Sequence, residues 1–256
     1  MPEHIDIIIL SYAKDEKLKD LTLQTIDTLL QSEDPQEIQF NILVIESNKT
    51  MKGNMGQRSY QYPGSKTIYP NETFGYNKYM NIGIKETISE YVCLCNNDLV
   101  FHKGWASAII REMKADPELL SASPYCTTFH KNEGFDENGP AQEGYFGTLG
   151  GWCIFAKRKV FDIIGLLDEK LIFWYSDADY CETLQKYHIK NSLVPASKVT
   201  HLGSESLKTV DDAEYSRLTQ LPRIYYSYKW KHHSYLKYLA QSVVFRIRQF
   251  LSPRPR

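Results

Sequence analysis

Three short apolar segments in the first hundred residues constrain the fold most, because each is rich in Ile, Val and Leu and each ends in polar residues. They cover residues 5–10, 38–45 and 91–95, and the intervening stretches 15–31 and 75–87 carry apolar residues at helical spacing. Strands that alternate with helices are typical of a parallel sheet covered by helices. The sequence therefore predicts an α/β fold with a mostly parallel sheet.

The polar residues that follow these three strands indicate where a ligand binds. In a sheet of this kind, ligands bind beyond the carboxyl ends of the strands. The residues found there are Ser11, Tyr12, Glu46, Ser47, Asn48, Asn96, Asn97 and Asp98. We expect these side chains to converge on one crevice.

The second half of the chain is less regular. Strands are expected at 119–125, 151–156 and 192–199, and helices at 105–113, 157–164 and 177–188. Ser176 precedes the last of these helices and is its expected N-cap. The polar, glycine-rich stretch 127–148 is long for a connection in a compact domain, which favours a lid over a binding site.

The formal net charge of −1 hides an uneven distribution. The first 214 residues carry a net charge of −10, whereas residues 215–256 carry nine Lys and Arg and no acidic residue. We therefore divide the chain into an acidic body, residues 1–206, and a basic arm, residues 207–256. Helices are expected in the arm at 213–226 and 235–251.

The basic arm interleaves its cations with aromatic residues, and three interpretations stay open. This combination suits a nucleic-acid backbone with stacked bases. It also suits a membrane surface, with the apolar residues of 243–251 among the headgroups and Arg246 and Arg248 outside. Alternatively, the arm packs its apolar stripe on the acidic body or on a second subunit of a homo-oligomer, with its cations solvated.

The five cysteines and the hydropathy indicate the compartment. The cysteine count is odd and the spacing fits no metal site, although Cys93 and Cys95 point to the same face of their strand. The start of the chain has no basic n-region, and no apolar run approaches the ~20 residues that span a bilayer. We expect a cytoplasmic protein with free thiols. Its basic arm could bring the protein to the inner face of the membrane.

Four residues suggest chemistry. Asp98 ends a buried strand, which suits a ligand of Mg²⁺ or Mn²⁺ on a diphosphate or, equally, a turn. Asp177 and Asp179 follow three aromatic residues, an environment that suits a general base, although a capping role is compatible with it. His201 is of interest as a ligand only beside Asp98, because a lone histidine is more often structural.

In their order and spacing, these motifs resemble glycosyltransferase family 2, enzymes of the Rossmann-like GT-A fold that use a nucleotide sugar. The resemblance covers residues 5 to about 206. The matching segments are Leu10–Ala13, Glu46, Gly75 and Tyr76 with Asn81 and Gly83, Asn96–Asp98, Gly150–Trp152, Arg158–Phe161, Gly165–Glu169, Ser176–Asp179 and Val199–Gly203.

The resemblance implies a function and a set of site residues. The body would bind the donor, a nucleoside-diphosphate sugar such as a UDP-sugar, with residues 1–100 and the acceptor with residues 101–206. The implied donor-binding residues are Ser11, Tyr12, Glu46, Asn77, Asn81, Asn97 and Asp98. Asp98 and His201 would hold Mn²⁺ or Mg²⁺, and Gly151, Trp152 and Trp174 would line the acceptor site. Asp177, or else Asp179, would be the general base of an inverting hexosyl or pentosyl transfer.

The acceptor is not determined by these motifs. The leading hypothesis is a cell-surface glycan or a lipid-linked precursor. A second is a hydroxylated, for example hydroxymethylated, base in DNA, held by the basic arm. A third changes the class of protein, to a non-catalytic module that binds a nucleotide sugar or carbohydrate. Asn96 stands where the family has Asp and Ser176 where it has Glu, and these departures keep the third hypothesis open.

Overall fold

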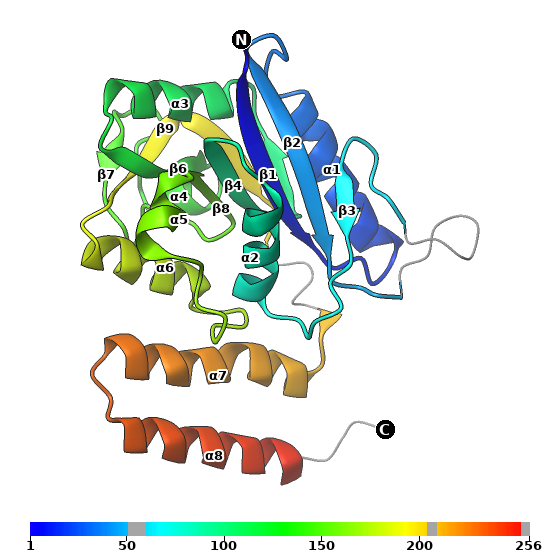
Figure 1. Ribbon diagram of the computed structural model, residues 1–256, viewed down its shortest axis with the longest axis vertical. Helices are drawn as coiled ribbons and strands as arrows, with labels where there is room; N and C mark the ends of the chain where they lie inside the picture. Colours follow the sequence, from blue (N-terminus) through cyan, green and yellow to red (C-terminus); the bar gives the residue numbers. More distant parts are fainter. Residues whose placement is uncertain (51–59, 204–208, 252–256) are drawn as a thin grey trace.

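The computed structural model describes residues 1–50, 60–203 and 209–251 of the chain. One mixed sheet lies between two layers of helices, and two further helices form an additional layer at one end (Figure 1). The predicted boundary between residues 206 and 207 falls outside the described residues, as do Arg254 and Arg256. None of the described helices is long and apolar enough to cross a membrane.

The first four strands pair in parallel, as the sequence predicts. They lie in the order β3-β2-β1-β4. Their bounds are Glu3–Ser11 for β1, Ile38–Glu46 for β2, Lys66–Ile68 for β3 and Tyr91–Asn96 for β4. Because β1, β2 and β4 run in one direction, Ser11, Glu46 and Asn96 come to one edge of the sheet.

The second half of the sheet departs from the predicted parallel order. Its strands are β5 (Leu99–Phe101), β6 (Leu119–Cys126), β7 (Gln142–Glu143), β8 (Cys153–Lys157) and β9 (Lys190–His201). Only β6 and β9 pair in parallel, whereas β8 runs antiparallel to β4 and β6, and β5 and β7 run antiparallel to β9. The chain enters β8 without a long crossover helix, and a strand that returns from the same edge is antiparallel.

Five of the helices cover the two faces of the sheet. Helices α1 (Glu16–Leu30) and α3 (Trp105–Ala115) pack on one face, and α2 (Tyr76–Glu86), α5 (Lys159–Ile164) and α6 (Ser176–Lys186) on the other (Figure 1). A short helix α4 (Phe129–Asn132) lies inside the predicted loop. Helices α7 (Asp212–Trp230) and α8 (Tyr235–Leu251) form the additional layer.

The predicted N-cap of α6 is wrong by one residue. Tyr175 occupies the cap position with φ 65°, and Ser176 is already helical. The Ser176 hydroxyl donates to the Phe173 carbonyl at 2.7 Å, so it closes the preceding turn instead of capping the helix.

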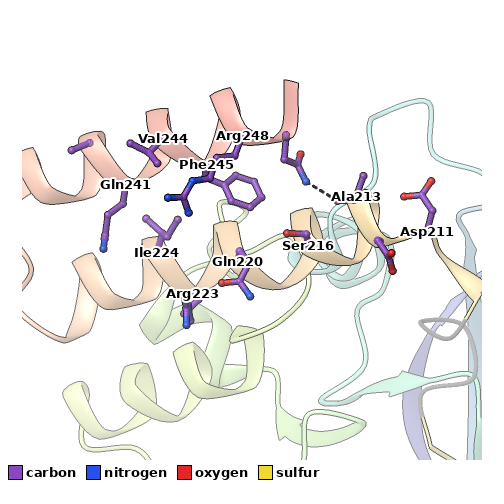
Figure 2. A pocket seen from close by; sticks show the side chains of 13 residues that line it. Asp211, Ala213, Ser216, Gln220, Arg223, Ile224, Gln241, Val244, Phe245 and Arg248 are labelled. Carbon is purple, nitrogen blue, oxygen red and sulfur yellow. Dashed lines mark hydrogen bonds between the residues drawn. The ribbon is translucent and has the colours of Figure 1, made fainter. Parts of the chain in front are cut away.

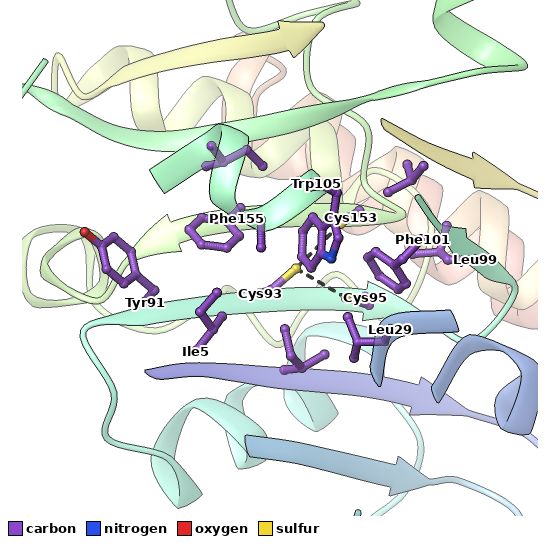
Figure 3. Packing of buried hydrophobic residues seen from close by; sticks show 14 of the residues in the cluster. Ile5, Leu29, Tyr91, Cys93, Cys95, Leu99, Phe101, Trp105, Cys153 and Phe155 are labelled. Atoms are coloured by element: carbon purple, nitrogen blue, oxygen red, sulfur yellow. Dashed lines mark hydrogen bonds between the residues drawn. The ribbon is translucent and has the colours of Figure 1, made fainter. Parts of the chain in front are cut away.

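Strand pairing adds a third thiol to the two that the sequence places on one face. Cys95 pairs with Cys153 across β4 and β8, so Cys153 joins Cys93 and Cys95 beneath Trp105 and Phe155 (Figure 3). The Cys93 sulfur lies 3.3 Å from that of Cys95 and 3.5 Å from that of Cys153. Burial raises the pKa of the Cys93 and Cys153 thiols, which keeps them protonated as core side chains.

Gly83 allows α2 to lie close against β1, and its replacement tests that contact. A Cβ atom at Gly83 would lie 2.4 Å from Cγ2 of Ile8. Alanine favours a helix over glycine, but we expect overpacking to exceed this gain, so that Gly83→Ala lowers the free energy of unfolding by about 1–2 kcal/mol in urea titrations. Exposed Lys85→Ala on the same helix is the control, with an expected change of less than about 0.5 kcal/mol. A stabilised Gly83→Ala variant would contradict this contact.

Candidate active site

Two cavities open at the carboxyl ends of the strands. The first has a volume of about 220 Å³ and is lined by Leu10, Ser11, Tyr12, Ser47, Phe74, Tyr76, Asn96, Asn97, Asp98, Phe173, Val210, Glu214 and Leu218. It contains members of all three predicted strand-end clusters. The crevice that the sequence predicts is therefore present.

The second cavity has a volume of about 440 Å³ and shares Tyr76, Asn96 and Phe173 with the first. Its other lining residues include Asn77, Gly151, Trp152, Trp174, Tyr175, Ser176, Asp177 and His201. The two cavities are therefore neighbours with a common wall. Burial raises the pKa of the Tyr76 phenol in that wall, so its hydroxyl stays a donor, here to the Gly151 carbonyl at 3.0 Å.

Asp98 and His201 come together through strand pairing. In the register of β5 with β9, Leu99 lies opposite His201, and the Leu202 N–H donates to the Asp98 carbonyl at 3.0 Å. The Asp98 Oδ1 and His201 Nε2 atoms are 3.2 Å apart. The Trp152 ring stacks on the imidazole with a centroid distance of 5.2 Å and an interplanar angle of 15°. The imidazole is thereby held facing the carboxylate.

The residues at this point fit a divalent cation. Asp98 Oδ1 and His201 Nε2 are both buried, and neither has an aligned hydrogen-bond partner among the described residues, even though they are in contact. A buried polar atom without a partner is costly, and a shared cation would satisfy both atoms. Carboxylate oxygen and imidazole nitrogen are suitable ligands for Mn²⁺.

Asp177 faces the second cavity. It lies in the first turn of α6 and is exposed, and its Oδ1 atom accepts a hydrogen bond from the Ala178 N–H at 2.8 Å. A Cβ atom at Gly151 would come within 2.7 Å of the Asp177 Cβ, so glycine is needed for this close approach. The second carboxylate oxygen of Asp177 lies beside Gly151.

Asp179 is buried and contacts the basic arm. Its Oδ1 atom accepts from Trp230 Nε1 at 2.6 Å and lies 2.7 Å from Lys229 Nζ. Burial raises the pKa of Asp179, although Lys229 and Trp230 act in the opposite direction. Because it does not line either cavity, Asp179 lacks the access that a base needs.

Lys229 ties α7 to the body through a second carboxylate as well. Its Nζ atom is 2.9 Å from Asp168 Oδ2, which also accepts from the Tyr225 hydroxyl at 2.7 Å. Burial alone would raise the pKa of Asp168, but the hydrogen bonds from Lys229 and Tyr225 outweigh it and lower that pKa below its usual range. The arm thus packs on the acidic body at this point, but it does so through a paired cation, whereas the third interpretation has the cations of the arm solvated.

Helix α7 also takes part in the first cavity. Glu214 and Leu218 line it from α7, and Val210 lines it from just before that helix. The backbone N–H of Trp174 donates to the Leu218 carbonyl at 3.3 Å. The arm is therefore part of the wall of the site and not only an appendage of the body.

Glu46 lies behind the first cavity and not in its lining. Its carboxylate is fully buried and accepts hydrogen bonds from the N–H groups of Ala13 and Asn48 and from the Tyr62 hydroxyl. Ser11 is 1% exposed, and its hydroxyl bonds to those of Thr22 and Tyr62. Both side chains are thus bonded within the protein. Ser11 nevertheless lines the first cavity, as does Tyr12.

The three predicted asparagines are also bonded within the protein. Asn81 binds the backbone of Leu167 through both its amide nitrogen and its oxygen, and it lines neither cavity. Asn77 donates to the Asp168 carbonyl, and its Oδ1 atom is buried without a partner in the described chain beside the second cavity. Asn97 lines the first cavity but donates its amide to Thr22.

The predicted acceptor residues lie together. Gly151, Trp152 and Trp174 all line the second cavity, and Trp174 is 44% exposed. The loop 127–148, by contrast, contributes no residue to either cavity. It packs beside the second cavity, because the Phe129 and His130 rings lie 4.9 and 5.7 Å from the Trp152 ring. Its role as a lid stays a prediction.

Sequence reasoning missed Tyr62, which fixes Glu46, and Lys229, which fixes Asp179. Both depend on contacts between segments that are distant in the sequence. Asn96, expected at the crevice from its place at a strand end, lines both cavities, as does Phe173.

Comparison with solved structures defines the class of fold. The crystal structure of GalNAc-T7 with UDP, GalNAc and Mn²⁺ aligns with a TM-score of 0.62 and 13% identity over 96% of this chain. This chain spans 55% of that protein's length. Staphylococcus aureus TarS, residues 1–349, aligns with a TM-score of 0.55 and 10% identity over 91% of this chain and 74% of its own.

A third structure is that of the catalytic domain of Drosophila β1,4-galactosyltransferase 7 with xylobiose. It aligns with a TM-score of 0.53 and 10% identity over 82% of this chain and 75% of its own. The protein thus has the fold of GT-A glycosyltransferases. No curated protein sequence matches the chain. A family model matches residues 6–157, more than half of the chain, and the protein belongs to glycosyl transferase family 2.

The Lys229 contact can be tested through stability. Lys229→Met leaves Asp168 and Asp179 without their shared cation, and we expect the free energy of unfolding to fall by about 2–3 kcal/mol, because this pair is only partly buried. Urea unfolding followed by tryptophan fluorescence measures the change. The matched control is Lys231→Met, which breaks an exposed pair with Glu182 and should cost less than about 1 kcal/mol. Equal losses in both variants would contradict a structural role for Lys229.

Proposed function

We propose that the protein is an inverting glycosyltransferase that moves a hexosyl or pentosyl group from a UDP-sugar, or a related nucleoside-diphosphate sugar, to a hydroxyl group of an acceptor. The observation that supports this most is the position of Asp98 and His201. They touch each other while Asp98 lines the first cavity and His201 the second, so a cation ligand pair lies between two adjoining binding spaces.

The first cavity is the proposed donor site. Tyr12 and Ser47 lie at its strand-end side, and Glu214 and Leu218 close it from α7. Asp98 and His201 are the proposed ligands of Mn²⁺ or Mg²⁺. When bound, such a cation neutralises charge on the diphosphate that leaves.

The second cavity is the proposed acceptor site, with Asp177 as the general base. An acceptor hydroxyl held there gives its proton to the Asp177 carboxylate as the oxygen bonds to the anomeric carbon. The bond from that carbon to the diphosphate oxygen breaks, and the configuration inverts. The Ala178 N–H holds the orientation of the carboxylate, and the Trp152 and Trp174 rings offer apolar faces to a sugar.

For the acceptor we propose a cell-surface glycan or a lipid-linked precursor. The alternative of DNA would need the aromatic rings of the arm to be free for stacking. However, Tyr225, Tyr226 and Trp230 donate their polar hydrogens to Asp168, Glu182 and Asp179 of the body. Tyr228 and Tyr238 stack on each other at a centroid distance of 4.9 Å.

The role of Asp177 predicts a loss of rate without a loss of donor binding. With a UDP-sugar panel and Mn²⁺, we expect Asp177→Asn to lower kcat by about 10²–10⁴-fold, while the donor Kd measured by calorimetry changes by less than about twofold. Asp179→Asn is the comparison, and its activity should follow its folded fraction. Retained transfer in Asp177→Asn would move the role elsewhere. Tight donor binding without turnover in the unaltered protein would indicate the non-catalytic module.

The cation site predicts a loss of metal-dependent donor affinity. Asp98→Asn keeps the shape of the side chain but removes its charge. We therefore expect the factor by which Mn²⁺ raises the affinity for UDP to be at least about tenfold smaller in this variant than in the unaltered protein. Calorimetric titration of UDP with and without Mn²⁺ measures this enhancement. Asp162→Asn is the control, because Asp162 is an exposed carboxylate on α5 that lines neither cavity. An equal Mn²⁺ enhancement in Asp98→Asn and the unaltered protein would refute the assignment.

A further inference from the structure

Helix α8 has only one neighbouring helix in the described chain. It lies on the side of α7 that faces away from the sheet (Figure 1). Between the two helices is an open groove of about 1100 Å³, with Phe245 and Ile224 among its lining residues (Figure 2). The helix is held near its ends, at one by the stack of Tyr238 on Tyr228 and at the other by a hydrogen bond from Gln249 to the Ala213 carbonyl. Helix α8 therefore does not cover the core of the body.

The face of α8 that points away from α7 is apolar over its whole length. The residues nearest α7 are the less exposed ones, Tyr238, Ser242, Phe245 and Gln249. At 100° per residue, the opposite arc contains only apolar residues. The residues that point away from the groove are Leu236, Leu239, Val243, Ile247, Phe250 and Leu251, and all of them are exposed. Ala240 and Val244 lie at one edge of the arc and line the groove toward α7.

Exposure along this outer face is large. Leu236 is 78% exposed, Ile247 52% and Phe250 85%. A continuous apolar face of this kind on a soluble protein marks an interaction surface. We define the outer face of α8 by the six apolar residues named above that point away from the groove.

Cations border this apolar face on both sides. Lys237 follows one margin of the arc and Arg246 the other, whereas Arg248 lines the groove toward α7. Residues 215–251 contain no Asp or Glu. An apolar face with Lys and Arg at its margins is the pattern of a helix that lies in the headgroup region of an anionic bilayer.

We propose that the outer face of α8 docks the protein on an anionic lipid surface, with α8 parallel to the membrane plane. A second copy of the chain fits less well, because pairing two such faces places the bordering cations of one copy near those of the other. A nucleic acid fits less well too, because its phosphates need cations at the centre of the contact, where α8 has Val243 and Ile247. The inference is independent of the donor chemistry and adds a location to it.

Docking through α8 would bring the active site to the membrane. Helix α7 lies between α8 and the sheet, and Glu214 and Leu218 on α7 line the first cavity. The site would therefore face the lipid side at a distance of one helix layer. This arrangement suits an acceptor that is itself anchored in lipid.

Vesicle flotation tests the proposal with the full chain. We expect binding to vesicles of phosphatidylcholine with 30% phosphatidylglycerol, at least about tenfold weaker binding to pure phosphatidylcholine, and a decrease at 0.5 M NaCl. Ile247→Asp and, separately, Phe250→Asp should each weaken binding at least about tenfold, because a charge then replaces an inserted apolar group. Lys237→Gln with Arg246→Gln should reduce the preference for anionic lipid.

The matched control is Ile88→Asp, because Ile88 is 91% exposed on the body, beyond the end of α2. It should leave vesicle binding unchanged, and none of these variants should alter UDP binding. Unchanged vesicle binding by Ile247→Asp, or no binding by the unaltered chain, would overturn the proposal. A protein that binds no vesicles but forms a dimer in light scattering, which Ile247→Asp converts to a monomer, would also overturn it. So would salt-sensitive binding to duplex DNA by a protein that binds no vesicles. If the unaltered protein shows no UDP binding or no turnover, that result counts against the proposed function and not against membrane docking.

Discussion

The pairing of β5 with β9 is the contact on which the candidate site depends. It is only three residue pairs long, yet it places Asp98, just before β5, against His201 at the end of β9. The rest of the sheet supports this pairing. Parallel strands β1, β2 and β4 set the edge at which Asp98 emerges, and the pairing of β9 with β6 carries His201 to the same edge. A cation site built this way uses residues about one hundred positions apart in the chain.

The sequence predicts the parts of the structure in which side-chain pattern decides the outcome. Strands β1, β2 and β4 are buried on both faces and read as apolar runs, so both their existence and their polar ends could be predicted. The antiparallel course of β8 could not, because nothing in its five residues records the direction in which the chain re-enters the sheet. Strand β5 is too short for a periodic signal.

The same distinction applies to the site residues. Asp98, His201, Asp177, Gly151 and Trp152 line the cavities where the motifs placed them. The resemblance implied donor-binding roles for Glu46 and Asn81, but their polar atoms are used by Tyr62 and by the backbone of Leu167. Asp177 and Asp179 look alike in the sequence. Only the position of α7, which brings Lys229 and Trp230 to Asp179, distinguishes an accessible carboxylate from a buried one.

The basic arm divides its charge between two surfaces. Lys229 of α7 and Lys231, which follows that helix, face the body, where they pair with Asp168, Asp179 and Glu182. These ion pairs hold α7 over the first cavity. They give one reason why the arm is basic and the body acidic. Lys237 and Arg246 of α8 border an apolar face that points away from α7. A helix that only stabilised the fold would turn that face inward, so the orientation of α8 is best explained by a surface outside the protein.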